Sequence, residues 1–399
     1  MEAIYFLGRY SGVIFFQITS PIEKMRIILT GIQLLLKTWI LEMYMKTMTM
    51  RERMLAVIQG NEHDRVPFAI YEILVPPKEV LQHMGHGRIG IIRFCPIYRV
   101  EHPNCKFESQ IFLKNETKYK RTYLHTPKGS LEEVRVYEPA FDSSTPSKHF
   151  IKTKQDYEIF WSYLEDCVIL ENYDQYYRDV ADLGDDGFPK VECERTPWQQ
   201  LWVEWIGLEG LSMHLADFPD HVDHTIDLMM KRERQQFEIA YRSPAPFINI
   251  PDNITAPAIG PARFRKYCVS LYDELAGMLE ERGAKLFIHM DGFLKPLWKD
   301  IANSKVGGLD SFTPTPDCDT SVADAVTMWP EKILQLNFPS SIHLQSQSEV
   351  RQVADDILAT AGHTGRLQIQ ISENVPLDIW RTTLPIIADA IEDFGSPFG

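Results

Sequence analysis

The sequence predicts a (β/α)₈ barrel, and two observations support this fold class. Short apolar segments alternate with helical patterns along most of the chain, which is typical of βαβ units and a parallel sheet. There are eight such segments, the number that closes a barrel of this kind. The expected strands are 65–71, 91–95, 188–194, 246–250, 285–289, 308–312, 332–338 and 366–371. An open nucleotide-binding sheet is the rival fold, but neither G-x-G-x-x-G nor G-x-x-x-x-G-K-[ST] follows a strand.

The helical patterns fall where a barrel needs them. A first helix is expected from Thr49 to about Gln59, with Gly60 as its C-cap. The patterns between the later strands are regular, whereas a long block before them is interrupted by glycine and proline. The other expected helices are 154–170, 198–241 with breaks, 262–282, 294–303, 320–329, 348–360 and 376–394.

Residues 106–138 follow a different pattern. Polar residues alternate there with apolar or aromatic ones, and HTPKG at 125–129 forms a turn. Alternation with a period of two is typical of strands that have one face in water. We therefore expect an antiparallel β meander inserted near 106–138.

Composition excludes several classes of function. The 399 residues include 55 Asp and Glu against 41 Lys and Arg, a net charge of −14. Nucleic acids and anionic membranes attract concentrated positive charge, so neither is an expected partner. The six cysteines show no C-x-x-C pair and no framework spacing. This pattern favours reduced thiols in the cytoplasm over a disulfide scaffold or a zinc finger.

The first 47 residues do not fit the rest of the chain. They have no basic start or small-residue cleavage site, which argues against a signal peptide. Lys37 and Glu42 interrupt their apolar run, which argues against a membrane span. An amphipathic helix, packed on the domain or lying on a membrane surface, is one alternative. We prefer a leader from an upstream start codon, so that 1–47 is non-native and the barrel occupies 48–399.

Polar residues follow the predicted strands, at the end where barrels of this class place their active sites. The segment KLFIHMDG, Lys285–Gly292, is the clearest case, because His289 and Asp291 lie two apart and point the same way on extended backbone. The strand-end residues are Tyr71, Glu72, Glu194, Arg195, Asp252, Asn253, His289, Asp291, Thr313, Asn337 and Glu373.

His289, Asp291 and Glu373 form the predicted catalytic and metal-binding centre. One imidazole and two carboxylates suit Zn²⁺, Mn²⁺ or Fe²⁺. Simpler interpretations are a core histidine, an N-cap at Asp291 and a carboxylate near a helix N-terminus at Glu373. Asn253 and Asn337 are candidates for orienting a substrate carboxylate or carbonyl, although turn formation explains each alone. The predicted substrate-binding residues are Tyr71, Glu194, Asp252, Asn253 and Asn337.

Four segments resemble the uroporphyrinogen decarboxylase superfamily. They are RERMLAVIQGNEHDRVP, IGPARFRKY, KLFIHMDG and ISENVPLDIWRTTLPIIADAI, in family order from about Thr49 to Phe394. The resemblance implies a (β/α)₈ barrel, in agreement with the strand count. It also implies one of two activities: porphyrinogen decarboxylation without a cofactor, or corrinoid-linked methyl transfer in which zinc activates a thiol.

Departures from the family narrow this choice. True decarboxylases carry an arginine-rich motif after the first strand, but YEILVPPKEV, Tyr71–Val80, contains no arginine. A porphyrinogen with many carboxylates would lack its counter-charges there. The methyltransferases carry His-x-Cys-Gly and a later cysteine. Here His289 matches the histidine, Asp291 replaces the first cysteine, and Glu373 lies near the second.

The resemblance therefore implies a divergent member of the superfamily, similar to the corrinoid-linked methyltransferase branch. It would move a methyl group between a small methylated substrate and a corrinoid protein or a pterin. A divalent metal or a protonated His289 would activate the leaving group. The alternatives are decarboxylation of a carboxylated substrate with no cofactor, and a non-catalytic partner of a corrinoid protein. A homodimer is left open.

Overall fold

The computed structural model describes residues 47–138, 143–375 and 378–398. The chain divides into two units, Met1–Met48 and Thr49–Gly399, and the second contains the whole fold below. Apart from Thr47, the predicted leader lies outside the described residues. The proposed domain boundary near Met48 therefore stays a prediction.

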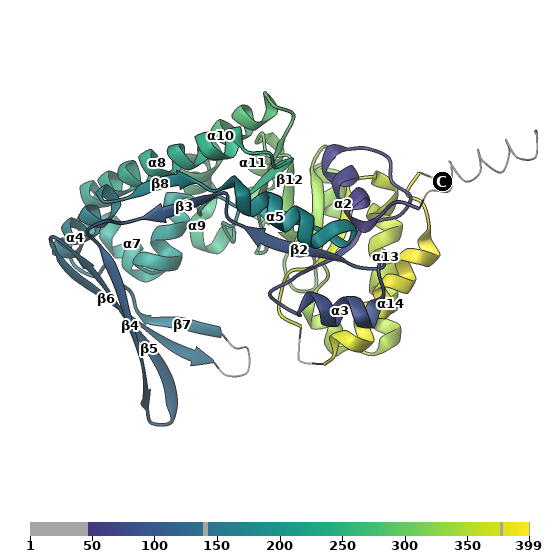
Figure 1. Ribbon diagram of the computed structural model, residues 1–399, viewed down its shortest axis with the longest axis horizontal. Coiled ribbons are helices and arrows are strands. Elements are labelled where there is room, and N and C mark those ends of the chain that lie inside the picture. The colour runs from purple at the N-terminus through teal and green to yellow at the C-terminus, as the bar shows by residue number, and fades with distance from the viewer. Residues whose placement is uncertain (1–46, 139–142, 376–377, 399) are drawn as a thin grey trace, which may run out of the picture. The chain divides into compact units, whose positions relative to one another are not determined.

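Eight parallel strands form the centre of the second unit (Figure 1). Each strand is four to six residues long, and all eight begin and end within three residues of the predicted bounds. The second strand pairs with the first. The strands are β1 (Phe68–Tyr71), β2 (Gly90–Cys95), β9 (Gly187–Val191), β10 (Phe247–Ile250), β11 (Lys285–His289), β12 (Gly308–Phe312), β13 (Ile333–Asn337) and β14 (Leu367–Ile371).

The sheet closes on itself. Its strand order is β10-β11-β12-β13-β14-β1-β2-β9, and every neighbouring pair is parallel. The two end strands meet just past β9, where the Cys193 N–H donates to the Asn249 carbonyl at 2.9 Å. Glu192 and Asn249 also form a parallel bridge. The predicted (β/α)₈ barrel is confirmed.

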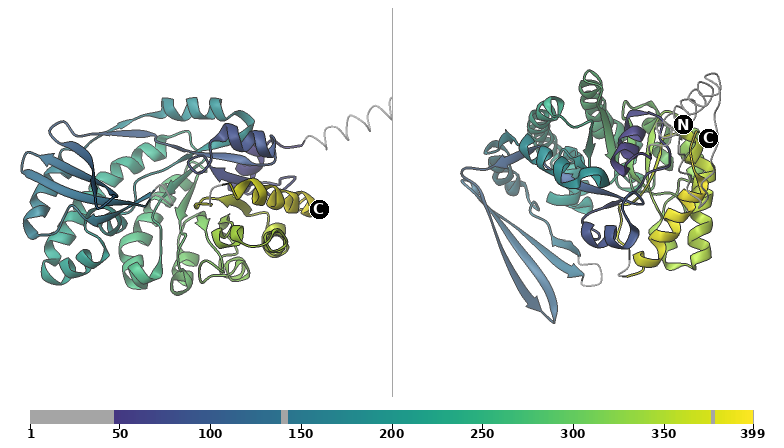
Figure 2. Two further views of the ribbon diagram at one scale, coloured as in Figure 1. Left: turned by 90° about the horizontal axis from the view of Figure 1, so that it is seen from below. Right: turned by 45° about the vertical axis from the view of Figure 1, so that its right-hand side comes forward.

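Helices surround the strands, as the two views of Figure 2 show. Their apolar faces and the outward side chains of the strands form one large buried cluster. The helices are α3 (Pro77–Met84), α5 (Tyr173–Leu183), α6 (Pro197–Gln200), α7 (Leu208–Asp217), α8 (Pro219–Arg242), α9 (Ala256–Arg263), α10 (Ser270–Glu280), α11 (Trp298–Asn303), α12 (Val322–Met328), α13 (Gln347–Ala361) and α14 (Trp380–Phe394).

Helix α2 (Met50–Gln59) closes one end of the barrel. It begins with a capping box between Thr49 and Glu52 and ends at Gly60, whose φ of 77° suits glycine. Its buried methionines belong to a second apolar cluster together with inward side chains of several strands, among them Phe247 and Phe287. Helix α2 thus covers the N-terminal ends of the strands. A functional site can therefore form at their C-terminal ends.

The inserted meander is confirmed and is longer than predicted. Strands β4 (Lys106–Lys114), β5 (Thr117–Thr126), β6 (Gly129–Glu138) and β7 (Ser143–Lys148) form one antiparallel sheet. Its inner face buries Leu124 and Leu131, and β5 and β6 contact helix α4 (Lys154–Glu165). The sheet projects from the barrel in Figure 1.

Two predicted helices end or break where other contacts prevail. The helix expected over 154–170 stops at Glu165, because β8 (Val168–Glu171) pairs antiparallel with β3 (Tyr98–Glu101). The block over 198–241 contains a π-helical turn, Leu201–Trp205, between α6 and α7. At β8, pairing with a distant strand overrides the local helical preference. Helices α3 and α5 were not predicted.

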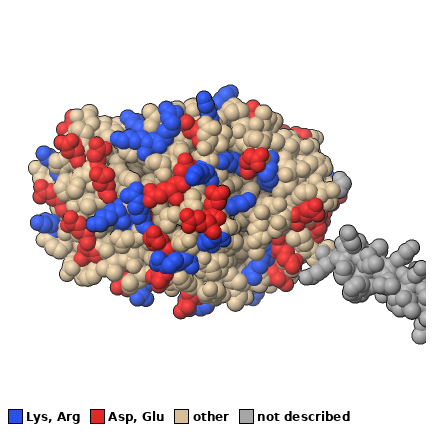
Figure 3. Space-filling view, turned by 90° about the horizontal axis from the view of Figure 1, so that it is seen from above, with Lys and Arg blue, Asp and Glu red and all other residues tan. Residues whose placement is uncertain are grey.

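Charged side chains of both signs lie side by side on the face drawn in Figure 3.

Within the described ranges, the helices are all too short or too polar to traverse a bilayer.

Candidate functional site

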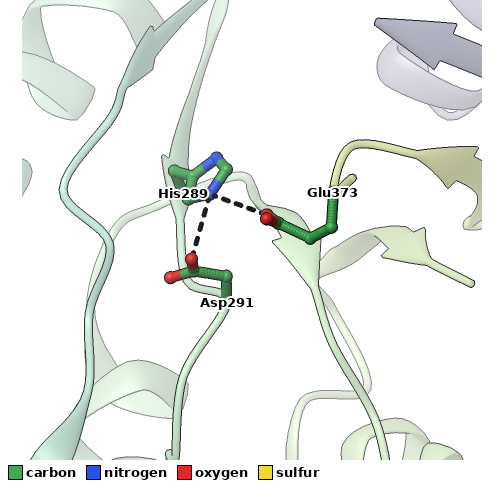
Figure 4. Close-up of side chains that lie close together, drawn as sticks. All are labelled: His289, Asp291 and Glu373. Carbon is green, nitrogen blue, oxygen red and sulfur yellow. Dashed lines mark ion pairs between the residues drawn. The ribbon is translucent and has the colours of Figure 1, made fainter. Parts of the chain in front are cut away.

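The C-terminal ends of two strands bring three predicted site residues together (Figure 4). His289 is the last residue of β11, Asp291 follows it by two, and Glu373 lies two residues past β14. His289 Nε2 is 3.5 Å from Asp291 Oδ2 and 3.8 Å from Glu373 Oε1. One potential ligand atom from each of the three lies within 4.8 Å of the others. We call these three residues the triad.

A buried carboxylate orients the imidazole of the triad. His289 Nδ1 donates to Asp310 Oδ2 at 3.0 Å, which directs Nε2 toward Asp291 and Glu373. None of the described residues forms a hydrogen bond with Nε2. Metal-ligating histidines have this arrangement, in which a carboxylate holds one ring nitrogen and the other faces the ion.

Asp310 itself is fixed by a network inside the barrel. Its side chain is completely buried and accepts hydrogen bonds from Tyr71 Oη at 2.8 Å, Lys190 Nζ at 2.7 Å and Gln370 Nε2 at 3.0 Å. The pairing of β12 with β13 shifts register between Leu309 and Phe312. Ser311 has a φ of 55° there, and its hydroxyl also reaches Tyr71 Oη, at 3.0 Å. This bulge aims two successive side chains at Tyr71.

The charges of the site favour a cation at its centre. Burial would lower the pKa of His289, but the carboxylates of Asp291 and Asp310 raise it to about 10. Burial and then the charge of Asp291 raise the pKa of Glu373 to about 7. Although burial opposes it, Lys190 and His289 hold the pKa of Asp310 well below its usual range. A proton on His289 or a bound cation supplies the positive charge that these carboxylates require.

The triad fits a divalent metal ion. Its Nε2 atom has no competing hydrogen bond from the described residues, and both carboxylates face it. Imidazole and carboxylate are ligands for Zn²⁺, Mn²⁺ and Fe²⁺. Asp291 and Glu373 retain 23% and 41% exposure, so the site is open on that side. An open position is what distinguishes a catalytic metal site from a structural one.

Three predicted substrate-binding residues lie close to the triad. Asn253, at a φ of 50°, donates through Nδ2 to Asp291 Oδ2 at 2.9 Å. Asn337 Oδ1 accepts from the backbone N–H of Ser372, the residue before Glu373, at 3.0 Å. Tyr71 acts through Asp310. These three side chains hold the triad in place from three different strands.

The remaining strand-end residues form their hydrogen bonds and ion pairs with partners outside the triad. Asp252 is fully buried and accepts hydrogen bonds from Thr196 and Tyr272. Glu194 forms an ion pair with Arg232. Glu72 pairs with Arg93 at 2.7 Å, and Arg195 donates to Asn253 at 2.7 Å. Thr313 donates to the carbonyl of Ser311.

Sequence reasoning missed the residues within the strands. Asp310 and Lys190 are charged side chains inside otherwise apolar strands, GLDSF and GFPKV, and Gln370 lies within LQIQI. A buried charge needs a partner, so an Asp and a Lys in two strands of one barrel were a usable signal. Cys318 was also missed. Its thiol donates to the Asp291 carbonyl at 3.1 Å, and burial together with Asp291 raises its pKa to about 12.

Comparison with known proteins shows the fold and no family. By sequence, no protein-family profile and no curated protein matches the chain. By structure, the chain is similar to a methyltransferase from Methanosarcina mazei, with a TM-score of 0.52 and 13% identity over 87% of this chain and 99% of that one. A thiamine phosphate pyrophosphorylase from Pyrococcus furiosus superposes with a TM-score of 0.19, at 14% identity over 40% of this chain and 89% of that one. The resemblance to the uroporphyrinogen decarboxylase superfamily stays a prediction.

Proposed function

We propose that the chain is a metal-dependent, methyltransferase-like enzyme with its centre at the triad. It would move a methyl group between a small methylated substrate and a corrinoid protein or a pterin. The observation that supports this most is the geometry of His289, whose Nδ1 is held by Asp310 while Nε2 faces two carboxylates. The methyltransferase with a similar fold is consistent with the proposal.

Each residue has a definite role in this proposal. His289, Asp291 and Glu373 hold Zn²⁺, Mn²⁺ or Fe²⁺, and a bound ion would supply Lewis acidity toward the leaving group. Asp310 keeps the His289 ring in the ligating orientation. Glu373, whose pKa is raised to about 7 without a metal, must be ionised to ligate the ion, so metal binding would release its proton below neutral pH. Asn253 and Asn337 maintain the positions of the two acidic residues.

Metal content is the first test. Purified protein dialysed against Zn²⁺ should retain about one ion per chain by elemental analysis. His289→Gln and Glu373→Gln should each lower the Zn²⁺ affinity at least tenfold, because each removes a ligand. His363→Gln is the matched control, since His363 follows α13 and contacts the Pro397 carbonyl instead. Retention of Zn²⁺ by both triad variants with unchanged affinity would refute the site.

Methyl transfer is the second test. Mixing the Zn²⁺-loaded protein with a corrinoid protein and a panel of methylated donors should change the corrinoid absorbance for at least one donor. Glu373→Gln should abolish that change. A panel without any response, tested with a pterin acceptor as well, would count against methyl transfer and leave the metal site standing.

Cofactor-free decarboxylation is the second candidate, and one observation favours it. Glu373 and His289 have pKa values of about 7 and about 10, so both carry protons near neutral pH without a metal. Either could protonate the carbanion that remains after CO₂ departs. CO₂ release from a carboxylated substrate by metal-free protein, lost in His289→Gln, would establish this activity instead. A non-catalytic partner of a corrinoid protein would bind it and show neither reaction.

We also place the enzyme in the cytoplasm. All six cysteines are described and all are free. Reduced cysteines are usual in that compartment.

A further inference from the structure

A separate cavity of about 310 Å³ has a lining that includes none of the three triad residues. It opens among the residues that follow β9 and β10, and its lining includes Glu194, Arg195 and Pro251. Two hydrogen bonds connect it to the triad. Arg195 Nη2 donates to Asn253 Oδ1 at 2.7 Å, and Asn253 Nδ2 donates to Asp291 Oδ2 at 2.9 Å. Arg195 in the cavity lining is therefore two hydrogen bonds away from Asp291, a residue of the triad.

Two N–H groups in the polar lining of the cavity have no hydrogen-bond acceptor among the described residues. Arg232 pairs with Glu194, and Arg195 Nη1 pairs with Glu204 Oε1 at 3.1 Å, so the formal charges balance. Arg195 Nε and Trp205 Nε1 are buried, however, and neither finds an acceptor among the described residues. Two buried N–H groups without acceptors are costly unless a ligand or water accepts from them. An oxygen-rich anion that reached both N–H groups would satisfy them.

The guanidinium of Arg195 is only partly used by its ion pair. Burial raises the pKa of its partner Glu204, and the charge of Arg195 opposes this. Arg195 Nε has no acceptor among the described residues. A guanidinium with an unused N–H is well suited to a carboxylate, which accepts two parallel hydrogen bonds.

The other side of the cavity is apolar. Tyr163 and Trp205 lie with ring centroids 5.6 Å apart and planes inclined at 48°. Trp205 thus offers both an aromatic face and an indole N–H. Binding sites of this kind combine an apolar wall with a few convergent polar groups.

We propose that this cavity binds the carboxylate of a small organic acid, with its apolar body against Tyr163 and Trp205. The proposal rests on the function proposed for the triad, since it names the substrate class: a methylated or decarboxylatable molecule that also carries a carboxylate. Arg195 and Trp205 would recognise the anion, and Asn253 would couple its arrival to Asp291.

Benzoate and its neutral analogue benzamide are the probes, with binding measured by titration calorimetry on Zn²⁺-loaded protein. Benzoate should bind at least tenfold more tightly than benzamide. Arg195→Gln should abolish that preference. Trp205→Phe keeps the ring and loses only the N–H, and should weaken benzoate binding about threefold. Arg234→Gln should leave both affinities unchanged, because Arg234 pairs with Glu274 on the outer surface.

Two further variants separate this proposal from the metal site. Asn253→Ser breaks the link to Asp291 but leaves Arg195 in place, so benzoate affinity should persist. His289→Gln should lose Zn²⁺ and still bind benzoate. If benzoate binding vanishes with His289→Gln, the anion sits on the metal and the cavity proposal is wrong. Equal binding of the two probes, no binding of either, or a preference that survives in Arg195→Gln would also overturn it, whatever the Zn²⁺ content.

Discussion

Asp310 and Asp252 are both fully buried carboxylates of the same barrel, yet the groups that contact them differ in charge. Asp310 lies in β12, inside the barrel, and contacts two cationic groups, Lys190 and His289. Asp252 follows β10 and accepts hydrogen bonds only from neutral groups, those of Thr196 and Tyr272, among the described residues.

The two environments shift the pKa in opposite directions. Burial alone raises the pKa of a carboxyl, and at Asp252 it raises the value to about 6 despite the hydrogen bonds of Tyr272 and Thr196. At Asp310 burial acts in the same direction, but Lys190 and His289 overcome it. The interior of the barrel therefore keeps a permanent negative charge at Asp310, directly behind His289. This charge is what makes the triad attractive to a cation.

Removing the charge of Asp310 should have the largest effect. Asp310→Asn leaves the buried Lys190 with only the partly exposed Glu192, at 3.2 Å, as a counter-ion, and we expect a loss of about 3–5 kcal/mol in unfolding free energy. Urea denaturation of the metal-free protein would measure it. The double variant Lys190→Met with Asp310→Leu should recover much of the loss, because neither charge of the Lys190–Asp310 pair is then buried. A loss below about 1 kcal/mol in the single variant would show that the network is not electrostatically coupled.

The pH dependence should differ between the two aspartates. A carboxyl with a pKa of about 6 in the folded state and near 4 in the unfolded state stabilises the fold fully below pH 4. That stabilisation is lost as the pH rises through 6. Relative to Asp252→Asn, the unaltered protein should therefore gain roughly 2–3 kcal/mol between pH 7 and pH 4.

The deficit of Asp310→Asn should behave differently over the same interval. The low pKa of Asp310 keeps it ionised when folded, so its stabilising effect is present above the unfolded pKa and falls only as the pH drops toward the folded value. Denaturation at pH 7, 5.5 and 4 would compare the variants. An Asp252 variant whose deficit is constant with pH would contradict the raised pKa.

Metal affinity should depend on one aspartate only. Asp310→Asn should weaken Zn²⁺ binding roughly 10- to 100-fold, the usual effect of losing a carboxylate behind a ligating histidine. Asp252→Asn should change the affinity by less than about threefold. Competition with a fluorescent chelator would give both values. Equal effects of the two variants would mean that Asp310 acts through general stability and not through the His289 ring.

The smallest contrast concerns two tyrosines. Tyr71 donates to Asp310, and Tyr272 donates to Asp252. Tyr272→Phe should cost about 1–2 kcal/mol, because Asp252 then relies on Thr196 alone. Tyr71→Phe should cost about 1 kcal/mol less, since Asp310 keeps Lys190, His289 and Gln370. Thermal melts of both variants would rank them, and the reverse order would contradict the comparison.

The fold was largely predictable from sequence, whereas the site was only half predictable. The eight strands were visible because parallel strands buried on both faces are apolar runs between turn residues. Local pattern failed at β8, whose strand conformation depends on pairing with β3. Local pattern also could not predict which strand-end residues contact each other. Asp252 and Asn253 are adjacent in sequence, but Asp252 bonds to Thr196 whereas Asn253 bonds to Asp291.

The sequence by itself determined the barrel, the inserted meander and the positions of His289, Asp291 and Glu373 at strand ends, because these follow from apolar periodicity and chain order. Only the tertiary structure decided that the three meet, because β12 and β13 lie between β11 and β14 in the sheet, and the curvature of the barrel brings the two strand ends together. It also decided the direction of each pKa shift. Burial raises the pKa of every buried carboxyl. The net shift then depends on the distant residue that contacts it, which is Lys190 for Asp310 and Tyr272 for Asp252.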